Sequence, residues 1–416
     1  MRSASNAYLA HVANGEVAKL KANLYDSSGT ATALTNEDFM EGFSFSGGTS
    51  PSGEFTVGGA VTGMFTFSLN NFDGTFDDYD FEGSYIIPYT YYDQNDAVRM
   101  GRYYLASHKT LGHVINCVAY DALRLMDMEA FSPTYPIKAL AAARQIASNH
   151  SLTVNEFANS NVTLPDPGMA LTERQALAYI AGFTGNYVRI NAEGNIVLEW
   201  YNTSSPIEQE TIFGQEVEVA DSSITGVRRG TSLVGSDGYV INVADNPYIN
   251  DNNALEALTR IYTRIGGTTF RPGTMTILAN PALEGGDCIE YDGVVIVITQ
   301  YYYRPTVSED VSCDVVTESE TDLRQRYVIA GADGYSIMIE SSAGSQFKNS
   351  TGSTTLTAKI LQGSTELDPD GTLFTYSWKK FNKLGNQVTF SASTKSITVN
   401  ADSIDEKATF SVEVTW

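Results

Sequence analysis

The stretch Gly53–Asp80 reads GEFTVGGAVTGMFTFSLNNFDGTFDDYD, and it carries strand and turn signals but no catalytic motif. Apolar and polar residues alternate over 65–70 (FTFSLN), which is the period of a half-buried β-strand. Asn71, Asp73 and Gly74 follow directly and are typical turn residues. The stretch therefore predicts two strands joined by a turn that is rich in glycine and acidic residues.

The composition of the whole chain favours a mainly β protein with some α+β elements. Its 416 residues suffice for several domains that each bury a core. Thr, Ser, Gly, Tyr, Phe and Val are abundant, and helix formers do not dominate. Tyrosine is unusually common, with 24 residues against 3 tryptophans. Because tyrosine is apolar with one polar end, this excess favours half-buried surfaces and contacts between subunits.

The charge is strongly one-sided. The chain has 26 basic and 49 acidic residues, a net charge of −23. This balance excludes nucleic-acid binding through a general phosphate-contacting surface. Two explanations remain open: the charge keeps the protein soluble, or it lines a channel that lets DNA slide past because like charges repel.

The three cysteines do not form a disulfide framework and match no zinc spacing. Cys117 lies in VINCVAY and Cys288 in GDCIEY, both apolar and strand-like, and Cys313 is the third. We expect buried structural thiols rather than nucleophiles.

We expect no catalytic, cofactor-binding or metal-binding residues, and hence no enzyme. The acidic cluster Asp73, Asp77, Asp78 and Asp80 lacks the ligand spacing of a calcium-binding EF-hand loop. No two of the histidines show the HExxH spacing of a zinc peptidase, and no phosphate-binding GxxxxGK[ST] loop occurs. The histidines are His11, His108, His113 and His150.

Neither a signal peptide nor a membrane span is predicted. The first residues, MRSASNAYLAHVANGEV, contain no long apolar run. No window approaches the 18 or so apolar residues that cross a bilayer.

Two helices are predicted in the first part of the middle region. One covers 137–147, with Pro136 in its first turn. The other begins at a capping box, Thr172-Glu173-Arg174-Gln175, and ends near Gly182 and Gly185. A hairpin should follow, with strands on either side of the turn 192–195.

A third helix is predicted over 253–265. Asn253-Ala254-Leu255-Glu256 resembles a capping pattern, and Gly266-Gly267 should end the helix. Its expected apolar face consists of Leu255, Leu258, Ile261, Tyr262 and Ile265.

These patterns divide the chain into five segments. A strand-rich domain covers 1–130, a helical and hairpin insertion 131–221, a second strand-rich domain 222–305, a linker 306–326, and a β-sandwich 327–416. The linker is placed by its acidic, polar composition. The sandwich is placed by alternating strands such as 374–378 and 408–416.

Several motifs together resemble the tail hub proteins of long-tailed bacteriophages and prophages. The run 179–201 (YIAGFTGNYVRINAEGNIVLEWY) is similar to their helix and hairpin, and 53–80 is similar to their first barrel. Gly238–Pro247, the helix 253–265 and the turn 280–287 (NPALEGGD) follow in the order of their second barrel. The turn is the most specific single piece.

The resemblance implies two β-barrel-like domains with a helical insertion. It also implies a homotrimer whose ring has near-sixfold symmetry, closes the tail tube at the tail tip and leaves a passage for DNA. The implied partners are distal tail and tail tube subunits, with transient passage of genomic DNA. The implied location is the virion, after synthesis in the bacterial cytoplasm.

The last segment resembles the immunoglobulin-like domains of phage tail proteins. Trp378 in TYSWKKF takes the place of their core tryptophan, and 405–412 (DEKATFSV) is similar to their late strands. Phe410 and Val412 stand where the immunoglobulin pattern has Tyr and Cys, so its disulfide is absent. This domain is expected to contact partners or the cell surface.

Two other classes of function stay open. The first is a secreted or surface carbohydrate-binding protein built of β-modules, in which loops 362–371 and 382–387 would contact host saccharide. In that case Trp378 could stack on a sugar, although its alternation with Phe374 and Tyr376 favours the core. The second is a cell-wall hydrolase, which the missing catalytic residues disfavour.

Overall fold

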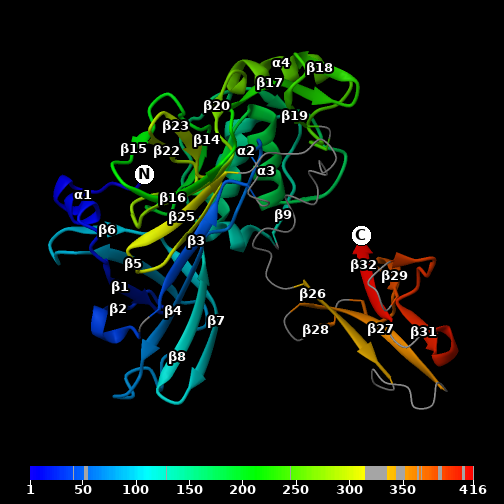
Figure 1. Cartoon of the computed structure of the whole chain (residues 1–416), viewed down its shortest axis with the longest axis horizontal. Coiled ribbons are helices and arrows are strands. Elements are labelled where there is room, and N and C mark those ends of the chain that lie inside the picture. Colours follow the sequence, from blue (N-terminus) through cyan, green and yellow to red (C-terminus); the bar gives the residue numbers. More distant parts are fainter. Residues whose placement is uncertain are drawn as a thin grey trace. The chain divides into compact units, whose positions relative to one another are not determined.

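The computed structural model describes residues 1–40, 42–50, 55–127, 129–243, 245–313, 335–342, 352–362, 365–366, 368–382, 387–404 and 408–415. The chain divides into two compact units, Met1–Gly331 and Ala332–Trp416. Strands dominate both units (Figure 1), so the predicted mainly β class is confirmed. The finer division of the first 305 residues into three domains stays a prediction. In the ranges above, no helix is long and apolar enough to cross a membrane.

One large sheet dominates the first unit. Its strands, in sheet order, are β16 (Ile212–Val217), β21 (Gly273–Leu278), β25 (Ser308–Cys313), β24 (Gln300–Tyr303), β3 (Ser44–Gly48), β4 (Met64–Asn70), β8 (Val114–Tyr120), β7 (Tyr103–Leu111), β5 (Tyr85–Tyr91), β1 (Lys19–Tyr25) and β2 (Ala31–Leu34), with β6 (Ala97–Arg99) attached to β5. Strands from both ends of the unit therefore share one sheet. They meet at the antiparallel pair β24–β3, where Tyr301 faces Gly47 and Tyr303 faces Phe45.

No sheet of the described residues closes into a barrel. β16 lies at one end of the large sheet and β2 at the other. The two barrel-like domains that the resemblance implies are therefore not confirmed. Strands from the two predicted domains instead join in one sheet through the β24–β3 pair.

The alternation predicted for 65–70 is confirmed by β4. Inward and outward positions alternate along the strand, and Phe65, Phe67 and Leu69 are buried. β4 pairs with β3 on one side and with β8 on the other. Because the strand is central in the sheet, both of its backbone edges are hydrogen-bonded to neighbouring strands.

The second strand predicted within 53–80 is not formed in the described part, because residues 71–80 after β4 contain turns and no strand. On the other side of β4, residues 55–63 contain only an isolated bridge, from Ala60 to Val188. Phe55 is fully buried, and its ring stacks on Phe270 with 4.0 Å between centroids. This segment therefore packs into a neighbouring core rather than pairing as a strand, because burial of a large aromatic ring is a strong local driving force.

The helices of the first unit are α1 (Asn6–Ala13), α2 (Ala139–Asn149), α3 (Glu173–Thr184) and α4 (Ala254–Ile265). The capping box predicted for α3 is confirmed. The Gln175 N–H donates to Thr172 Oγ1 at 3.2 Å, and the Thr172 N–H donates to Gln175 Oε1 at 2.9 Å. Gly185 ends the helix with φ 76°, a conformation that glycine adopts readily.

Two helix details differ from the predictions. α2 begins later than predicted, because Ile137–Lys138 form strand β10, and Pro136 therefore precedes the helix. At α4, the Asn253 side chain does not cap the helix; its Oδ1 accepts the Asn250 N–H and its Nδ2 donates to Tyr248 O, both at 2.8 Å. Leu255 is also 71% exposed rather than on the buried face.

Smaller sheets support the helices and include the predicted hairpin, which is confirmed as β13–β14. The pairs are β9 (Ala130–Phe131) with β12 (Leu171–Thr172), β10 with β11 (Thr163–Leu164), and β13 (Tyr187–Ile190) with β14 (Ile196–Glu199). The larger groups are β15 (Ile207–Glu208), β22 (Cys288–Tyr291) and β23 (Val294–Val297), and β17 (Ser222–Arg229), β18 (Ser232–Gly235), β19 (Tyr239–Asn242) and β20 (Thr269–Phe270). Short 3₁₀ turns are η1 (Asn36–Asp38), η2 (Ala122–Asp127) and, in the second unit, η3 (Ala401–Ser403).

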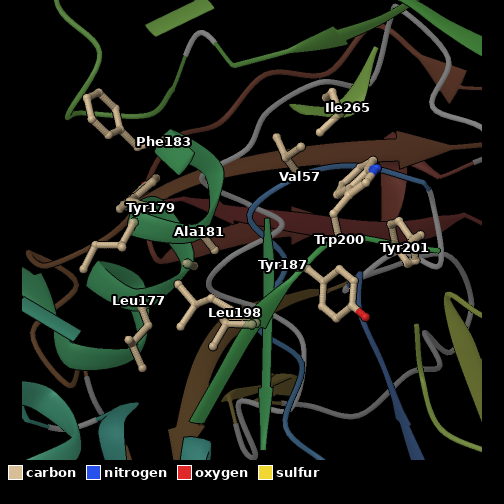
Figure 2. Packing of buried hydrophobic residues seen from close by; sticks show 14 of the residues in the cluster. Val57, Leu177, Tyr179, Ala181, Phe183, Tyr187, Leu198, Trp200, Tyr201 and Ile265 are labelled. Carbon is tan, nitrogen blue, oxygen red and sulfur yellow. The ribbon is translucent and has the colours of Figure 1, made fainter. Parts of the chain in front are cut away.

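The first unit has two apolar cores. One lies under the first strands and includes Phe45, Phe65 and Leu20. The other surrounds α3, and Figure 2 shows α3 residues such as Leu177 beside the hairpin residue Leu198. In this second core, side chains from α3, α4, the hairpin and 55–60 pack together. The helical segment is therefore joined to the sheet region by a shared core.

The predicted linker begins too early. Ser308–Cys313 form β25, which pairs with β21 and β24 inside the large sheet. Glu309, Val311 and Cys313 face inward and are buried. The acidic residues at 309 and 310 resemble a solvated linker, but the alternation of burial shows a strand. The rest of the predicted linker, 314–326, lies outside the described residues.

The second unit contains two sheets that share one core. The first consists of β26 (Tyr335–Ser341), β27 (Ser353–Gln362), β28 (Thr365–Glu366) and β31 (Ser396–Asn400), and the second of β29 (Thr375–Phe381), β30 (Gln387–Val388) and β32 (Thr409–Thr415). Trp378 of the second sheet packs with Ile360 and Val399 of the first. The core position of Trp378 is thus confirmed, whereas the immunoglobulin-like β-sandwich assignment stays a prediction.

Candidate functional site

The structure does not bring the acidic residues of the 73–80 turn together around one point. Asp73 Oδ1 accepts the Thr75 N–H, and Asp80 Oδ1 accepts the Glu82 N–H. Asp77 Oδ1 instead accepts the side-chain amide of Asn71. In the part of the chain that the structure describes, no group of three or more His, Cys, Asp or Glu side chains could hold a metal ion.

The four histidines also lie apart, and each has a local partner. His11 is 2.8 Å from Glu16, and His150 pairs with the buried Glu173. His108 packs against Phe81, and His113 stacks on Phe72. These contacts stabilise turns and helix ends, and they do not place two histidines at one site.

All three cysteines are free and buried, as predicted. Burial raises the pKa of Cys117 to about 12 and that of Cys288 to about 12. Both groups are therefore neutral thiols at physiological pH, and a neutral thiol is a poor nucleophile.

The turn 280–287 (NPALEGGD) is the centre of a buried polar network. Glu284 Oε1 lies 3.1 Å from Arg189 Nη1 and 3.7 Å from Arg2 Nε. Arg189 Nε also donates to Glu199 Oε1 at 2.7 Å. The Glu284 carboxylate thus joins the N-terminal segment to the β13–β14 hairpin.

Arg2 extends this network into the first strands. Its guanidinium donates to the carbonyl oxygens of Met100 at 3.3 Å and Pro281 at 3.0 Å, and to the Tyr301 hydroxyl at 3.2 Å. The residue is only 5% exposed. Because a buried guanidinium is stable only when its donors are matched, this arrangement fixes four distant segments relative to one another.

The two glycines of the turn are required by close backbone approaches. A Cβ at Gly285 would lie 2.8 Å from the Cα of Gly48 in β3. Gly286 has φ +98°, and a Cβ there would lie 2.0 Å from the Tyr187 hydroxyl oxygen. The motif therefore places its glycines where β3 and β13 pack against the turn.

Two buried carboxyl groups lie close to the same turn. Glu309 of β25 accepts the backbone N–H of Asn280 at 2.9 Å, and burial raises its pKa to about 8. Asp121 accepts the N–H groups of Gly63 and Leu123, and burial raises its pKa to about 7. Burial thus favours the neutral form of both carboxyl groups, which lowers the cost of placing them in the interior.

A cavity of about 40 Å³ lies in this network, and its lining includes Arg2, Asp121, Arg189 and Glu284. A space of this size has room for water but not for a substrate. The arrangement therefore acts as a structural junction between segments. Sequence reasoning identified the turn but did not predict that Arg2, Arg189 or Glu309 would contact it. Of these three residues, only Glu309 had a recognisable signal of burial, which was its alternation with Val311.

Comparisons with known proteins give distant likenesses only. No family model matches the chain, and no curated protein matches it. Among solved structures, the chain is similar to a tail protein from Neisseria meningitidis MC58, with 16% identity, TM-score 0.46, and coverage of 71% of this chain and 97% of that one. This structure and the two in the next paragraph are all of tail proteins, and their TM-scores are too low to establish a common fold with this chain.

Two further structures give similar values. The 43 kDa tail protein of prophage MuSo2 from Shewanella oneidensis has 11% identity and TM-score 0.41, with 70% of this chain and 95% of that one covered. The prophage tail protein gp18 from Listeria monocytogenes EGD-e has 12% identity and TM-score 0.43, with 70% and 94% covered.

Proposed function

We propose that this chain is a structural protein of a phage or prophage tail, and specifically the hub subunit at the tail tip. The observation that carries the proposal is the turn 280–287. Its sequence is the most specific part of the resemblance to tail hub proteins, and in this chain it forms the buried junction of four segments. A hub must transmit force without deforming, and such a junction suits that role.

In this proposal three copies form a closed ring that seats on the tail tube. The distal tail and tail tube subunits are its partners, and the ring leaves a passage for genomic DNA. The net charge of −23 suits that passage, because it repels phosphate groups. The protein would be made in the bacterial cytoplasm and would act in the virion, without enzymatic activity.

The second unit is proposed to contact other tail proteins or the cell surface. The competing proposal, a carbohydrate-binding protein, loses one of its candidate contacts in this structure. Trp378 is 2% exposed and donates its indole N–H to Thr394 O at 2.8 Å, so its ring cannot stack on a sugar. Saccharide binding by this unit would have to use its loops.

The test is the mass of the purified chain in solution, followed by electron microscopy of the particles. We expect a mass three times the 45.2 kDa of one chain, and rings with a central hole. The ring proposal is contradicted by a discrete dimer, or by open chains that grow with concentration. Cleavage of purified cell-wall material by the chain would instead support the hydrolase class.

A further inference from the structure

We infer that the loop Glu216–Asp221 of one copy inserts Val219 into an apolar groove on a second copy. The groove lies between the start of β1 and the turn after β24. This inference rests on the proposed ring and names one contact that would build it. The two surfaces differ from each other, so the contact is heterologous, which is the kind that generates rings.

The groove is open, largely apolar and edged by positive charge. Its volume is about 620 Å³. Val17, at its edge, is 45% exposed. The lining residues used here are Val17, Lys19, Phe39, Met40, Arg304 and Pro305.

The positive charge is not neutralised within the described part of the chain. Neither the Lys19 ammonium nor the Arg304 guanidinium has a carboxylate at ion-pair distance among those residues. Arg304 lies over the ring of Tyr302, which is itself 48% exposed. In a chain with 49 acidic and 26 basic residues, two cations that have no carboxylate partner among the described residues and lie beside an apolar groove favour an acidic, apolar occupant.

The loop after β16 has that character. Val219 is 96% exposed, more than any other large apolar side chain in the described ranges. Glu216, at the end of β16, and Glu218 both precede it in the chain, and both are exposed. The loop backbone is held in place, since the Glu218 N–H donates to Pro272 O at 2.9 Å. The loop therefore presents one apolar side chain next to exposed carboxylates on a backbone that is hydrogen-bonded to the neighbouring segment.

The loop cannot fill the groove of its own chain. Val217, next to the loop, pairs with Gly273 at the first residue of β21. The groove lies near the other end of β21, at Leu278. A Cβ added at Gly15, two residues before the groove residue Val17, would lie 3.6 Å from both Leu278 and Val307, and Val307 follows the groove residue Thr306. Six residues of strand span roughly 20 Å. The occupant must then come from another molecule, and a second copy supplies the loop with the matching charge.

Cysteine cross-linking tests the contact directly. Val219→Cys and Val17→Cys change exposed side chains, while the native cysteines are buried. We expect mild oxidation of a mixture of the two variants to give a disulfide-linked dimer, and the double variant to give covalent rings. The matched control is Leu255→Cys, which is also exposed, mixed with Val17→Cys; it should give no dimer.

Charge and burial changes give a second readout. Val219→Asp should weaken self-association roughly 10- to 100-fold in light scattering, since it loses the burial of one valine side chain. Glu218→Lys should weaken it as well, and combining Glu218→Lys with Lys19→Glu and Arg304→Glu in one chain should restore assembly, because every contact then has its charges reversed.

The outcomes separate this contact from the ring itself. If the unmodified chain forms rings but Val219→Asp assembles equally well and no cross-link appears, the contact is wrong and the ring stands. Cross-linking of Val17→Cys only to itself marks a symmetric contact and also overturns the inference. If the unmodified chain stays monomeric at high concentration, no second copy fills the groove, and imaging on tail tubes then tests the hub role alone.

Discussion

Replacing Glu284 by glutamine should destabilise the first unit, because its carboxylate is shared by the buried Arg2 and the half-buried Arg189. The side chain is 9% exposed, and its Oε1 lies 3.1 Å from Arg189 and 3.7 Å from Arg2. Glutamine keeps the shape but removes the charge. Loss of one partner from a buried ion pair costs about 3–5 kcal/mol. Because Arg189 retains Glu199 at 2.7 Å, we expect the lower end, about 3 kcal/mol.

The assay is urea unfolding followed by the fluorescence of Trp200, which is buried in the second core of the first unit. To isolate this signal, the comparison is made in a background with Trp378→Phe and Trp416→Phe. Glu193→Gln is the matched control, since Glu193 is exposed on the neighbouring hairpin and should change stability by less than about 0.5 kcal/mol. If Glu284→Gln is as mild as this control, the network does not stabilise the junction and the reasoning fails.

Three further predictions follow from named contacts. Gly286→Ala should lower the free energy of unfolding by more than about 2 kcal/mol in the same assay, since its Cβ would lie 2.0 Å from the Tyr187 hydroxyl oxygen. Gly293→Ala is the control and should cost less, because Gly293 also has a positive φ of +75° but a Cβ there would meet open space. Glu309 has a pKa of about 8 when folded and 4.5 otherwise, so its protonation stabilises the fold fully below pH 4.5 and this stabilisation is lost as the pH rises to about 8. Glu309→Gln, measured at pH 5 and pH 8, should therefore gain stability relative to the parent at the higher pH, and a constant difference would contradict the assignment. Thr172→Ala should cost about 1 kcal/mol through loss of the α3 cap, and an unchanged unfolding midpoint would show that the cap is unimportant.

Local signals in the sequence predicted local structure well. The capping box at Thr172 and the alternation in β4 depend only on neighbouring residues, and both are confirmed. Asn253 carried an equally good local signal, but contacts with Tyr248 and Asn250 engage its side chain instead. A cap is thus predictable only where no tertiary partner competes for the capping atom.

Long-range pairings were not predictable from the sequence pattern. Phe55 reads as part of a strand, yet its ring is buried against Phe270, far away in the chain. The turn 280–287 was recognised as specific, but its partner Arg2 is separated from it by most of the unit. Neither periodicity nor spacing carries information about such partners, because they are chosen by packing of the whole domain.

The β24–β3 pair has a consequence for how the chain is made. β3 ends at Gly48, but its partner β24 begins only at Gln300, so the ribosome adds about 250 residues between them. At roughly 5–20 residues per second, this takes on the order of 10–50 s. During that time one edge of β3 lacks its final neighbour, β24. The strand β4 follows β3 closely in the sequence, but it pairs only with the other edge of β3. Maturation of the large sheet therefore waits for nearly the entire first unit, which makes a chaperone an advantage for its yield.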